Sequence, residues 1–262
     1  MARSLDAFVT KTITPLPREG NPPVRIVETD HGLLNSIGLQ GPGIDRFVVE
    51  QLPSLTALEL ELWVSVGGFS ATDFRIVCER LDAEPSVSTI ELNLSCPNVD
   101  EAPEAAAELV AAARGVTGKP LYAKLSPAQW DLATAAKAVA AAGADGLSLV
   151  NTLRGLAVDP RTGAPVLARG LGGYSGPALR PVALAAVFTC ANATGLPVVG
   201  MGGVSTGEHV HDLVSVGATA VALGTILFAD LDAPTRVRRE FTALLPARHR
   251  AVSTPPGIDS VV

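Results

Sequence analysis

A cysteine lies between two carboxamides at the end of a strand-like segment. Apolar residues alternate from Ile90 to Leu94, and the polar stretch Ser95-Cys96-Pro97-Asn98 follows. Pro97 cannot continue a sheet ladder, so we expect the strand to end there. In a parallel α/β barrel the catalytic groups gather at that end of the strands. The Cys96 thiol can therefore act as a base if an electropositive neighbour lowers its pKa.

The other cysteines and the histidines limit the alternatives. Free cysteines are commonly small buried residues, and we interpret Cys78 and Cys190 in this way because they fall in helical patterns. Acyl transfer by Cys96 is less attractive, since its usual histidine partner is hard to find. The histidines lie in a loop, a surface-like helix and the C-terminal tail: His31, His209, His211 and His249.

Two glycine motifs close the last two strand-like runs. They are Gly200-Met201-Gly202-Gly203 and Leu223-Gly224-Thr225, with helical patterns expected after them. Glycines let backbone amides approach an anion closely, and a phosphate site follows strands seven and eight in many barrels. Tight turns are the alternative for either motif alone.

Lysines and asparagines mark the same rim. Lys11 and Lys124 stand near the ends of strand-like runs, where they indicate an anionic ligand or a nearby carboxylate. A lysine with an interior salt bridge is the alternative. Carboxamides add donors and acceptors, although each alone could be a turn amide. They are Asn35, Asn93, Asn98 and Asn151.

The composition excludes several classes of protein. Hydrophobic residues make up 47% of the 262 residues and charged residues 18%, which suits an α/β fold with strands buried on both faces. The net charge of -6 comes with scattered lysines and arginines, so no basic stripe indicates nucleic acid or an anionic membrane. Three cysteines without metal-ligand spacing predict a cytoplasmic protein. Residues 1–7 lack the apolar run of a signal peptide or membrane span.

Strand-like and helical runs alternate along the chain. Seven strands are predicted: Ala7 to Thr12, Leu60 to Val66, Thr89 to Ser95, Pro120 to Ser126, Gly146 to Asn151, Pro197 to Gly202 and Ala220 to Gly224. Helices are predicted over Glu104 to Val116, Ala128 to Ala142, Leu179 to Thr194 and Glu208 to Val216. The glycines expected to cap them are Gly118, Gly143, Gly195 and Gly217.

These repeated units predict a (β/α)₈ barrel in a single domain, residues 1–262. A doubly wound open sheet is the alternative that periodicity alone does not exclude. A closed barrel needs eight strands, so we expect one strand to be missing before Ala7. Two interruptions, residues 15–43 and 153–176, are expected to pass over the barrel mouth, with extended runs at Val24 to Thr29, Leu33 to Ile37 and Val166 to Ala168.

Together these residues resemble the dihydroorotate dehydrogenase family, flavin enzymes of pyrimidine synthesis built on a (β/α)₈ barrel. The resemblance covers nearly the whole chain. Besides the Asn93 to Asn98 motif and the two glycine motifs, it rests on Val9-Thr10-Lys11-Thr12, Gly20-Asn21-Pro22-Pro23, Leu34-Asn35-Ser36-Ile37-Gly38-Leu39, Lys124-Leu125, Val150-Asn151-Thr152 and Gly172-Gly173-Tyr174-Ser175-Gly176-Pro177.

The resemblance implies Cys96 as catalytic base, hence class 1, since the membrane-associated class 2 uses a serine there. It implies that dihydroorotate and its product orotate are held by Lys11, Asn35, Ile37, Gly38, Leu39, Asn93, Asn98, Asn151 and Thr152. It implies that FMN is held by Lys11, Ser65, Asn93, Lys124, Val150, Gly176, Gly202, Gly203, Gly224 and Thr225. A cation at Lys124 favours the anionic reduced ring.

Within class 1, Arg25 to Thr29 and Ile37 to Gln40 look more like the 1B type. That type partners an FAD and iron-sulfur subunit in a heterotetramer and passes electrons to NAD⁺. The fumarate-linked 1A homodimer is the near rival. The sequence has no cysteine set for an iron-sulfur cluster, so a cluster must come from a partner chain.

The sequence departs from the family in two places. The match starts at about the second barrel strand, and Ser65 replaces an asparagine that is usual in many relatives. Two other functions are therefore considered. One is a non-catalytic subunit or degenerate paralogue that lost its flavin; the other is a flavin reductase acting on another dihydropyrimidine.

Overall fold

A curled parallel sheet forms the centre of the protein. The computed structural model describes residues 4–94, 103–129, 131–245 and 260–261. The sheet has the strand order β1-β4-β5-β6-β7-β10-β11-β12. Its strands are β1 (Ala7–Val9), β4 (Glu61–Val66), β5 (Val87–Asn93), β6 (Leu121–Lys124), β7 (Gly146–Leu149), β10 (Val198–Met201), β11 (Ala220–Ala222) and β12 (Ser260–Val261).

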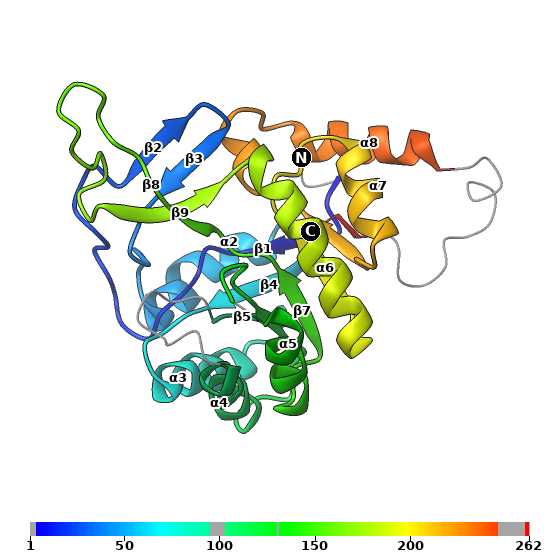
Figure 1. Ribbon diagram of the computed structural model, residues 1–262. Helices are drawn as coiled ribbons and strands as arrows, with labels where there is room; N and C mark the ends of the chain where they lie inside the picture. Colours follow the sequence, from blue (N-terminus) through cyan, green and yellow to red (C-terminus); the bar gives the residue numbers. More distant parts are fainter. Residues whose placement is uncertain (1–3, 95–102, 130, 246–259, 262) are drawn as a thin grey trace.

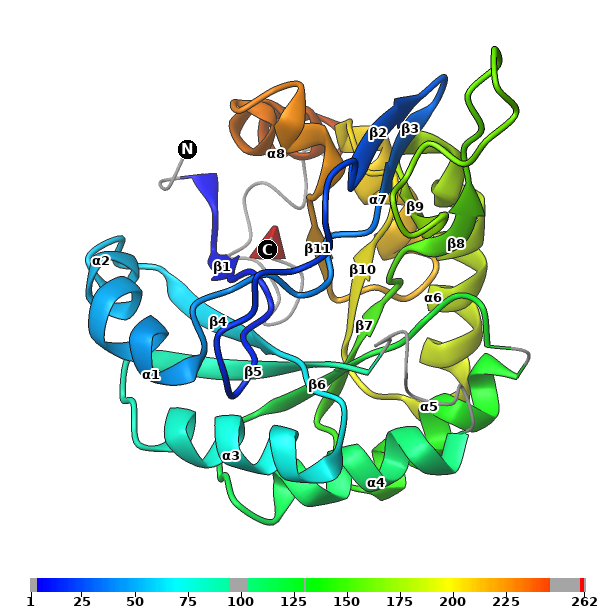
Figure 2. The same cartoon turned by 90° about the vertical axis from the view of Figure 1, so that its left-hand side faces the viewer.

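The strand order decides between the two architectures that the sequence left open. Each long strand of this sheet pairs in parallel with the next one along the chain, without the reversal of order that defines a doubly wound sheet. The seven predicted strands are confirmed, and β12 is an addition that pairs with β11. Within the described residues, no ladder joins β1 to β11 or β12. The sheet is a curled part of a (β/α)₈ barrel (Figure 2).

Helices lie along the outer face of this sheet (Figure 2). They are α1 (Ile44–Arg46), α2 (Leu52–Thr56), α3 (Ala71–Asp82), α4 (Pro103–Arg114), α5 (Leu132–Ala141), α6 (Arg180–Thr194), α7 (Gly207–Ser215) and α8 (Ala233–Leu244). Short irregular helices are η2 (Phe47–Gln51), η3 (Pro177–Leu179) and η4 (Thr225–Phe228). Between sheet and helices lies the main core, which includes fully buried Phe74, Val110 and Val187. Each such side chain contributes about 1.5–3 kcal/mol through burial.

Local chemistry fixes several helix ends. The side chains of Ser70, Asp131 and Thr206 accept hydrogen bonds from the first turns of α3, α5 and α7, which stabilises helix starts. The predicted start of α5 at Ala128 is wrong because Asp131 caps the helix. Gly195 ends α6 in the left-handed conformation, as predicted.

The predicted cap at Gly118 is wrong. Helix α4 ends at Arg114, four residues earlier, and Gly118 has no positive φ. The Arg114 guanidinium donates to the carbonyl oxygens of Thr117 and Lys119, the latter at 2.8 Å. A side chain therefore holds the segment after the helix, where a left-handed glycine was expected. Gly143 and Gly217 do have positive φ and follow the ends of α5 and α7.

A second core fills the inside of the curled sheet. Ala7, Trp63, Val199 and Ala220 pack there, with Tyr122 and other side chains beside them. The rings of Trp63 and Tyr122 lie 4.6 Å apart between centroids. Ala7 of this inner core also lines the pocket described below, so the inner core forms part of the pocket floor.

A four-stranded antiparallel sheet covers the carboxyl ends of the barrel strands. Its order is β2-β3-β9-β8, and Figure 1 shows it to one side of the main sheet. Its strands are β2 (Ile26–Thr29), β3 (Gly32–Asn35), β8 (Leu153–Leu156) and β9 (Leu171–Ser175). The two predicted interruptions thus pair with each other. The extended run predicted over Val166 to Ala168 is wrong, since only an isolated bridge at Leu167 occurs there.

No helix within the described residues is both long and apolar enough to cross a membrane.

Candidate functional site

A pocket of about 890 Å³ opens at the carboxyl ends of the barrel strands. This is the end where barrels place their catalytic groups. Residues in or directly after seven strands of the main sheet surround it, together with the edge of the second sheet. Most of the predicted site residues line it: Lys11, Ser65, Lys124, Val150, Asn151, Thr152, Gly176, Gly202, Gly203, Gly224 and Thr225.

A chain of hydrogen bonds joins polar side chains at the carboxyl ends of β1, β4, β5 and β7. Asn151 Nδ2 donates to Asn93 Oδ1 at 2.9 Å, and Asn93 Nδ2 donates to Thr12 Oγ1 at 3.1 Å. Thr12 Oγ1 lies 3.1 Å from Ser65 Oγ. The side chains of both asparagines are thereby fixed in orientation, although Asn93 does not itself line the pocket. Fixed amides of this kind can orient a polar ring.

Lys124 and Glu91 form an ion pair at the wall of the pocket. Lys124 Nζ lies 3.4 Å from Glu91 Oε1, and the Glu91 side chain is only 2% exposed. Both residues line the pocket from the neighbouring strands β5 and β6. The ion pair holds the end of the Lys124 side chain against Glu91, so its amino group is fixed in position at the wall of the cavity.

Lys11 lines the pocket from the segment that follows β1. Its Nζ donates to the carbonyl oxygen of Gln40, which places the segment before Gln40 beside the pocket. Partial burial, and secondly the nearby Arg25 guanidinium, hold the pKa of Lys11 below its usual value. Lys11 is therefore more readily neutralised at alkaline pH than an ordinary lysine.

The glycine turns meet at the far end of the pocket. Gly202 and Gly203 both have positive φ, and a Cβ on Gly203 would lie 2.8 Å from the carbonyl oxygen of Gly176. A Cβ on Gly224 would meet no atom within 4 Å, so its bare backbone faces open space. Thr225 Oγ1 lies 2.8 Å from Ser175 Oγ. Three strand ends thus present backbone to one corner of the cavity, as an anion site requires.

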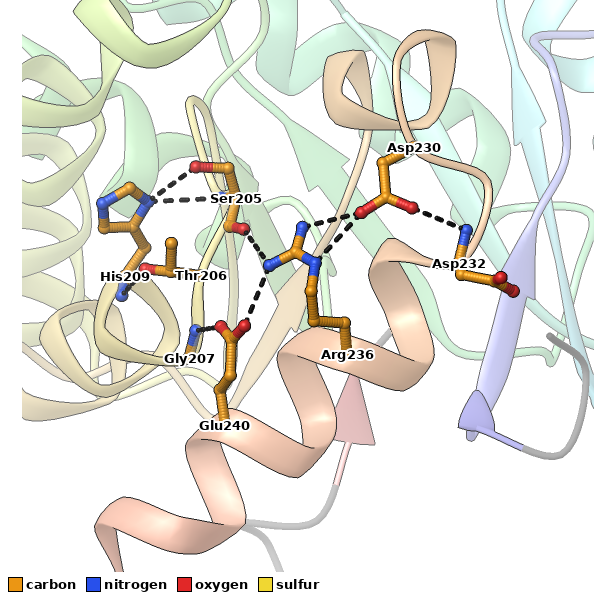
Figure 3. Close-up of polar contacts among 8 residues, drawn as sticks. All are labelled: Ser205, Thr206, Gly207, His209, Asp230, Asp232, Arg236 and Glu240. Atoms are coloured by element: carbon orange, nitrogen blue, oxygen red, sulfur yellow. Dashed lines mark hydrogen bonds and ion pairs between the residues drawn. The ribbon is translucent and has the colours of Figure 1, made fainter.

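The N-terminus of α7 is already satisfied by protein groups. Thr206 Oγ1 accepts from His209 N at 3.3 Å, and Glu240 Oε2 accepts from Gly207 N at 2.8 Å (Figure 3). A carboxylate near a helix N-terminus takes the position an anion would occupy. An anion in this part of the pocket would therefore meet the glycine turns and not the start of α7.

Comparison with known proteins identifies the family. The family model of dihydroorotate dehydrogenase matches residues 1–245. The chain belongs to the dihydroorotate dehydrogenase family. A relative from Geobacillus kaustophilus, named dihydroorotate dehydrogenase B (NAD(+)), catalytic subunit, is 42% identical over 233 residues, covering 86% of this chain and 74% of the relative. The protein of the same name from Listeria innocua is 43% identical, with 86% and 77% covered.

A solved structure agrees with the fold. The crystal structure of the dihydroorotate dehydrogenase of Eimeria tenella in complex with ferulenol aligns with a TM-score of 0.77. The alignment covers 91% of this chain and 74% of that chain, at 22% sequence identity. This likeness supports the barrel architecture alone. The identity to the bacterial catalytic subunits places this dihydroorotate dehydrogenase family member with the B type.

Enzymes of the dihydroorotate dehydrogenase family are flavoproteins, and the pocket fits a flavin. Its volume lies in the usual range for cofactor sites. Apolar Val9, Met201 and Ala222 link its wall to the inner core, which offers a surface for an aromatic ring. The glycine turns at one end match a phosphate, and Lys124 matches an electron-rich ring edge.

The structure does not place every residue predicted from the family at the pocket. Cys96 and Asn98 are outside the described residues. Asn35 does not line the pocket, and its Nδ2 donates to the Gly173 carbonyl oxygen at 3.2 Å in the second sheet. Ile37, Gly38 and Leu39 also do not line it. They belong to the segment that Lys11 contacts through Gln40.

Sequence reasoning missed Glu91 and Thr12 as parts of this site. Glu91 alternates with Ile90 and Leu92 and so faces the barrel interior, which was a readable signal for a buried acid needing a cation. Thr12 gave no such signal. Its part in the amide chain depends on the placement of β1 beside β4.

Proposed function

We propose that this protein oxidises dihydroorotate to orotate with FMN as its resident flavin and Cys96 as the base. The supporting observation is the pocket itself. Its lining combines Asn151, whose side chain is held by Asn93, with two lysines and a glycine-lined corner. Relatives that are 42–43% identical carry the name of this activity.

The polar chain is suited to hold a planar ring with amide groups. Asn151 uses Nδ2 on Asn93 Oδ1 and accepts from Thr152 N at 2.8 Å through Oδ1. Its orientation is thus set from both ends. We assign Asn93, Asn151 and Thr152, together with Asn35, Asn98 and the segment Ile37 to Leu39, to the substrate.

The cations have separate roles in this proposal. Lys11 faces the carboxylate of the substrate and the flavin edge, while Lys124 and Ser65 face the flavin. Val150, Gly176, Gly202, Gly203, Gly224 and Thr225 hold its side chain and phosphate. A bound flavin supplies the hydride acceptor, and Cys96 takes the proton from the neighbouring substrate carbon.

We further infer that NAD⁺ is the final acceptor, reached through an FAD and iron-sulfur partner subunit. Two relatives are named as NAD⁺-linked catalytic subunits, a name that implies a second subunit. The described residues contain no cluster of three or more cysteines, histidines or carboxylates fit for a metal. A cytoplasmic location is also proposed, and the free thiols Cys78 and Cys190 support it.

Anaerobic spectroscopy tests this function directly. FMN-loaded protein should lose its flavin absorbance when dihydroorotate is added, and dihydrouracil or dihydrothymine should have little effect. Cys96→Ser should slow this reduction about a hundredfold or more near neutral pH, because a serine hydroxyl is a poorer base. Cys190→Ser is the matched control, since Cys190 is fully buried in α6.

Three results contradict parts of the proposal. Failure of the protein to bind added FMN shows that the pocket does not hold the cofactor. Reduction of the Cys96→Ser variant at the wild-type rate removes Cys96 from the mechanism. If dihydrouracil reduces the flavin faster than dihydroorotate does, the substrate is another dihydropyrimidine and not dihydroorotate.

A further inference from the structure

One arginine on α8 connects the two loops that form the glycine corner of the pocket. Arg236 Nη1 donates to the carbonyl oxygen of Ser205 at 3.0 Å, in the loop after β10. Its Nε and Nη2 donate to Asp230 Oδ2 at 3.0 and 2.9 Å, in the segment after β11 and η4. Figure 3 shows the guanidinium group between these two loops.

A glutamate extends this connection to α7. Arg236 Nη1 lies 3.0 Å from Glu240 Oε1, and the other oxygen of Glu240 accepts from Gly207 N at 2.8 Å. His209 Nδ1 holds the same loop from the other side, because it lies 3.2 Å from Ser205 N. Ser205 is thus fixed through both its carbonyl oxygen and its amide.

The residues next to these anchors line the pocket. Gly202 and Gly203 lead into Ser205, and Gly224 and Thr225 lead through η4 to Asp230. Arg236 itself is not among the lining residues. It acts from behind the wall, where its side chain is 32% exposed.

We propose that Arg236 is a positioning residue that sets the spacing of the two glycine turns and thereby makes the pocket selective for a phosphorylated flavin. This inference rests on the proposed flavin site. A guanidinium group presents donors in a fixed fork, so it can hold Asp230, Ser205 and Glu240 together. A lysine offers one point charge and cannot reproduce that geometry.

The two forms of the flavin distinguish positioning from general stability. FMN carries the phosphate and riboflavin lacks it, whereas their rings are the same. Loosening the glycine turns weakens the binding of FMN alone, because only FMN has a phosphate. A general loss of the fold weakens the binding of both FMN and riboflavin. Apo-protein titrated with each flavin, followed by quenching of flavin fluorescence, therefore measures the effect separately.

The expected result is specific. Arg236→Gln and Arg236→Lys should each raise the Kd for FMN about tenfold, which corresponds to about 1.4 kcal/mol, and should leave the Kd for riboflavin unchanged. Asp230→Asn should give the same pattern, and combining it with Arg236→Lys should add little, since both remove one interaction. The matched control is Arg239→Gln, an exposed arginine of the same helix.

Three outcomes count against the inference. Equal FMN affinity in Arg236→Gln and wild type shows that the arginine does not position the turns. Equal losses of FMN and riboflavin affinity show a general effect on the fold. Additive effects in the double variant show that Asp230 and Arg236 act independently. If wild type binds neither flavin, the proposed function fails first, and this result is distinct from the other three.

Discussion

The ammonium group of Lys124 lies 3.4 Å from the carboxylate of Glu91 on the adjacent barrel strand. The Glu91 side chain is 2% exposed and that of Lys124 is 22% exposed. A buried carboxylate costs several kcal/mol to desolvate, and a close cation offsets much of that cost. The pair therefore holds the amino group of Lys124 at the pocket wall, with the Glu91 carboxylate buried beside it.

Glu91→Gln should destabilise the protein and raise the reduction potential of the bound flavin. Removing the carboxylate leaves Lys124 without this partner, so the free energy of unfolding should fall by about 2 kcal/mol in urea denaturation. The flavin reduction potential should rise, because an uncompensated cation favours the anionic reduced ring. Glu79→Gln, an exposed position on α3, is the control. If the Glu91→Gln variant keeps both the wild-type stability and the wild-type flavin potential, the Lys124–Glu91 ion pair has neither of these roles.

The sequence predicted the barrel strands because buried parallel strands have a simple signature. β7 is buried at all four positions, and its apolar run is visible in the sequence. The strand ends were predicted too far, by two residues for Gly146 to Asn151, because Val150 and Asn151 already turn into the pocket. These two residues at the end of the strand line the pocket and are not part of the sheet.

Other features depend on contacts between distant segments. β9 contains Gly172 and Gly173, which have low strand propensity, and it is a strand because β3 and β8 flank it. The Arg236 contacts join α8 to loops up to 31 residues earlier in the chain. No local pattern encodes such a pairing, so sequence reasoning found the glycine turns but not their support.

Asn93→Ala should weaken substrate binding more than stability. It removes the acceptor of Asn151 Nδ2 and the donor to Thr12 Oγ1, so Asn151 loses its fixed orientation. The KM for dihydroorotate should rise about tenfold or more, since one lost hydrogen bond to a polar ligand corresponds to roughly 1–2 kcal/mol. Steady-state kinetics on the FMN-loaded protein measures this change.

Asn192→Ala is the matched control for that experiment. Asn192 is exposed on α6, and its Nδ2 donates to the Phe188 carbonyl oxygen at 2.7 Å. Its removal should leave KM unchanged. A wild-type KM in Asn93→Ala shows that the amide chain does not orient the substrate.

Cys78 and Cys190 should resist alkylation in the native protein. Burial raises the pKa of the Cys78 thiol to about 12 and that of the Cys190 thiol to about 12. Because only the thiolate reacts, a raised pKa leaves roughly one part in ten thousand reactive at pH 8. Iodoacetamide treatment followed by peptide mass spectrometry should show neither residue labelled until urea is added. Rapid native labelling of either thiol contradicts the burial seen here.

Gly207→Ala should be strongly destabilising. A Cβ there would lie 2.2 Å from Phe241 N and 2.5 Å from the Glu240 carbonyl carbon, so α7 and α8 must move apart. Overpacking of this kind costs about 1–3 kcal/mol, and urea denaturation should show the loss. Gly118→Ala is the control, because its Cβ would meet no atom within 4 Å and its φ is not positive. Separation of α7 from α8 also pulls Glu240 away from the Gly207 amide, so the variant should bind FMN more weakly as well. Equal stability of the two alanine variants contradicts the close packing of α7 on α8.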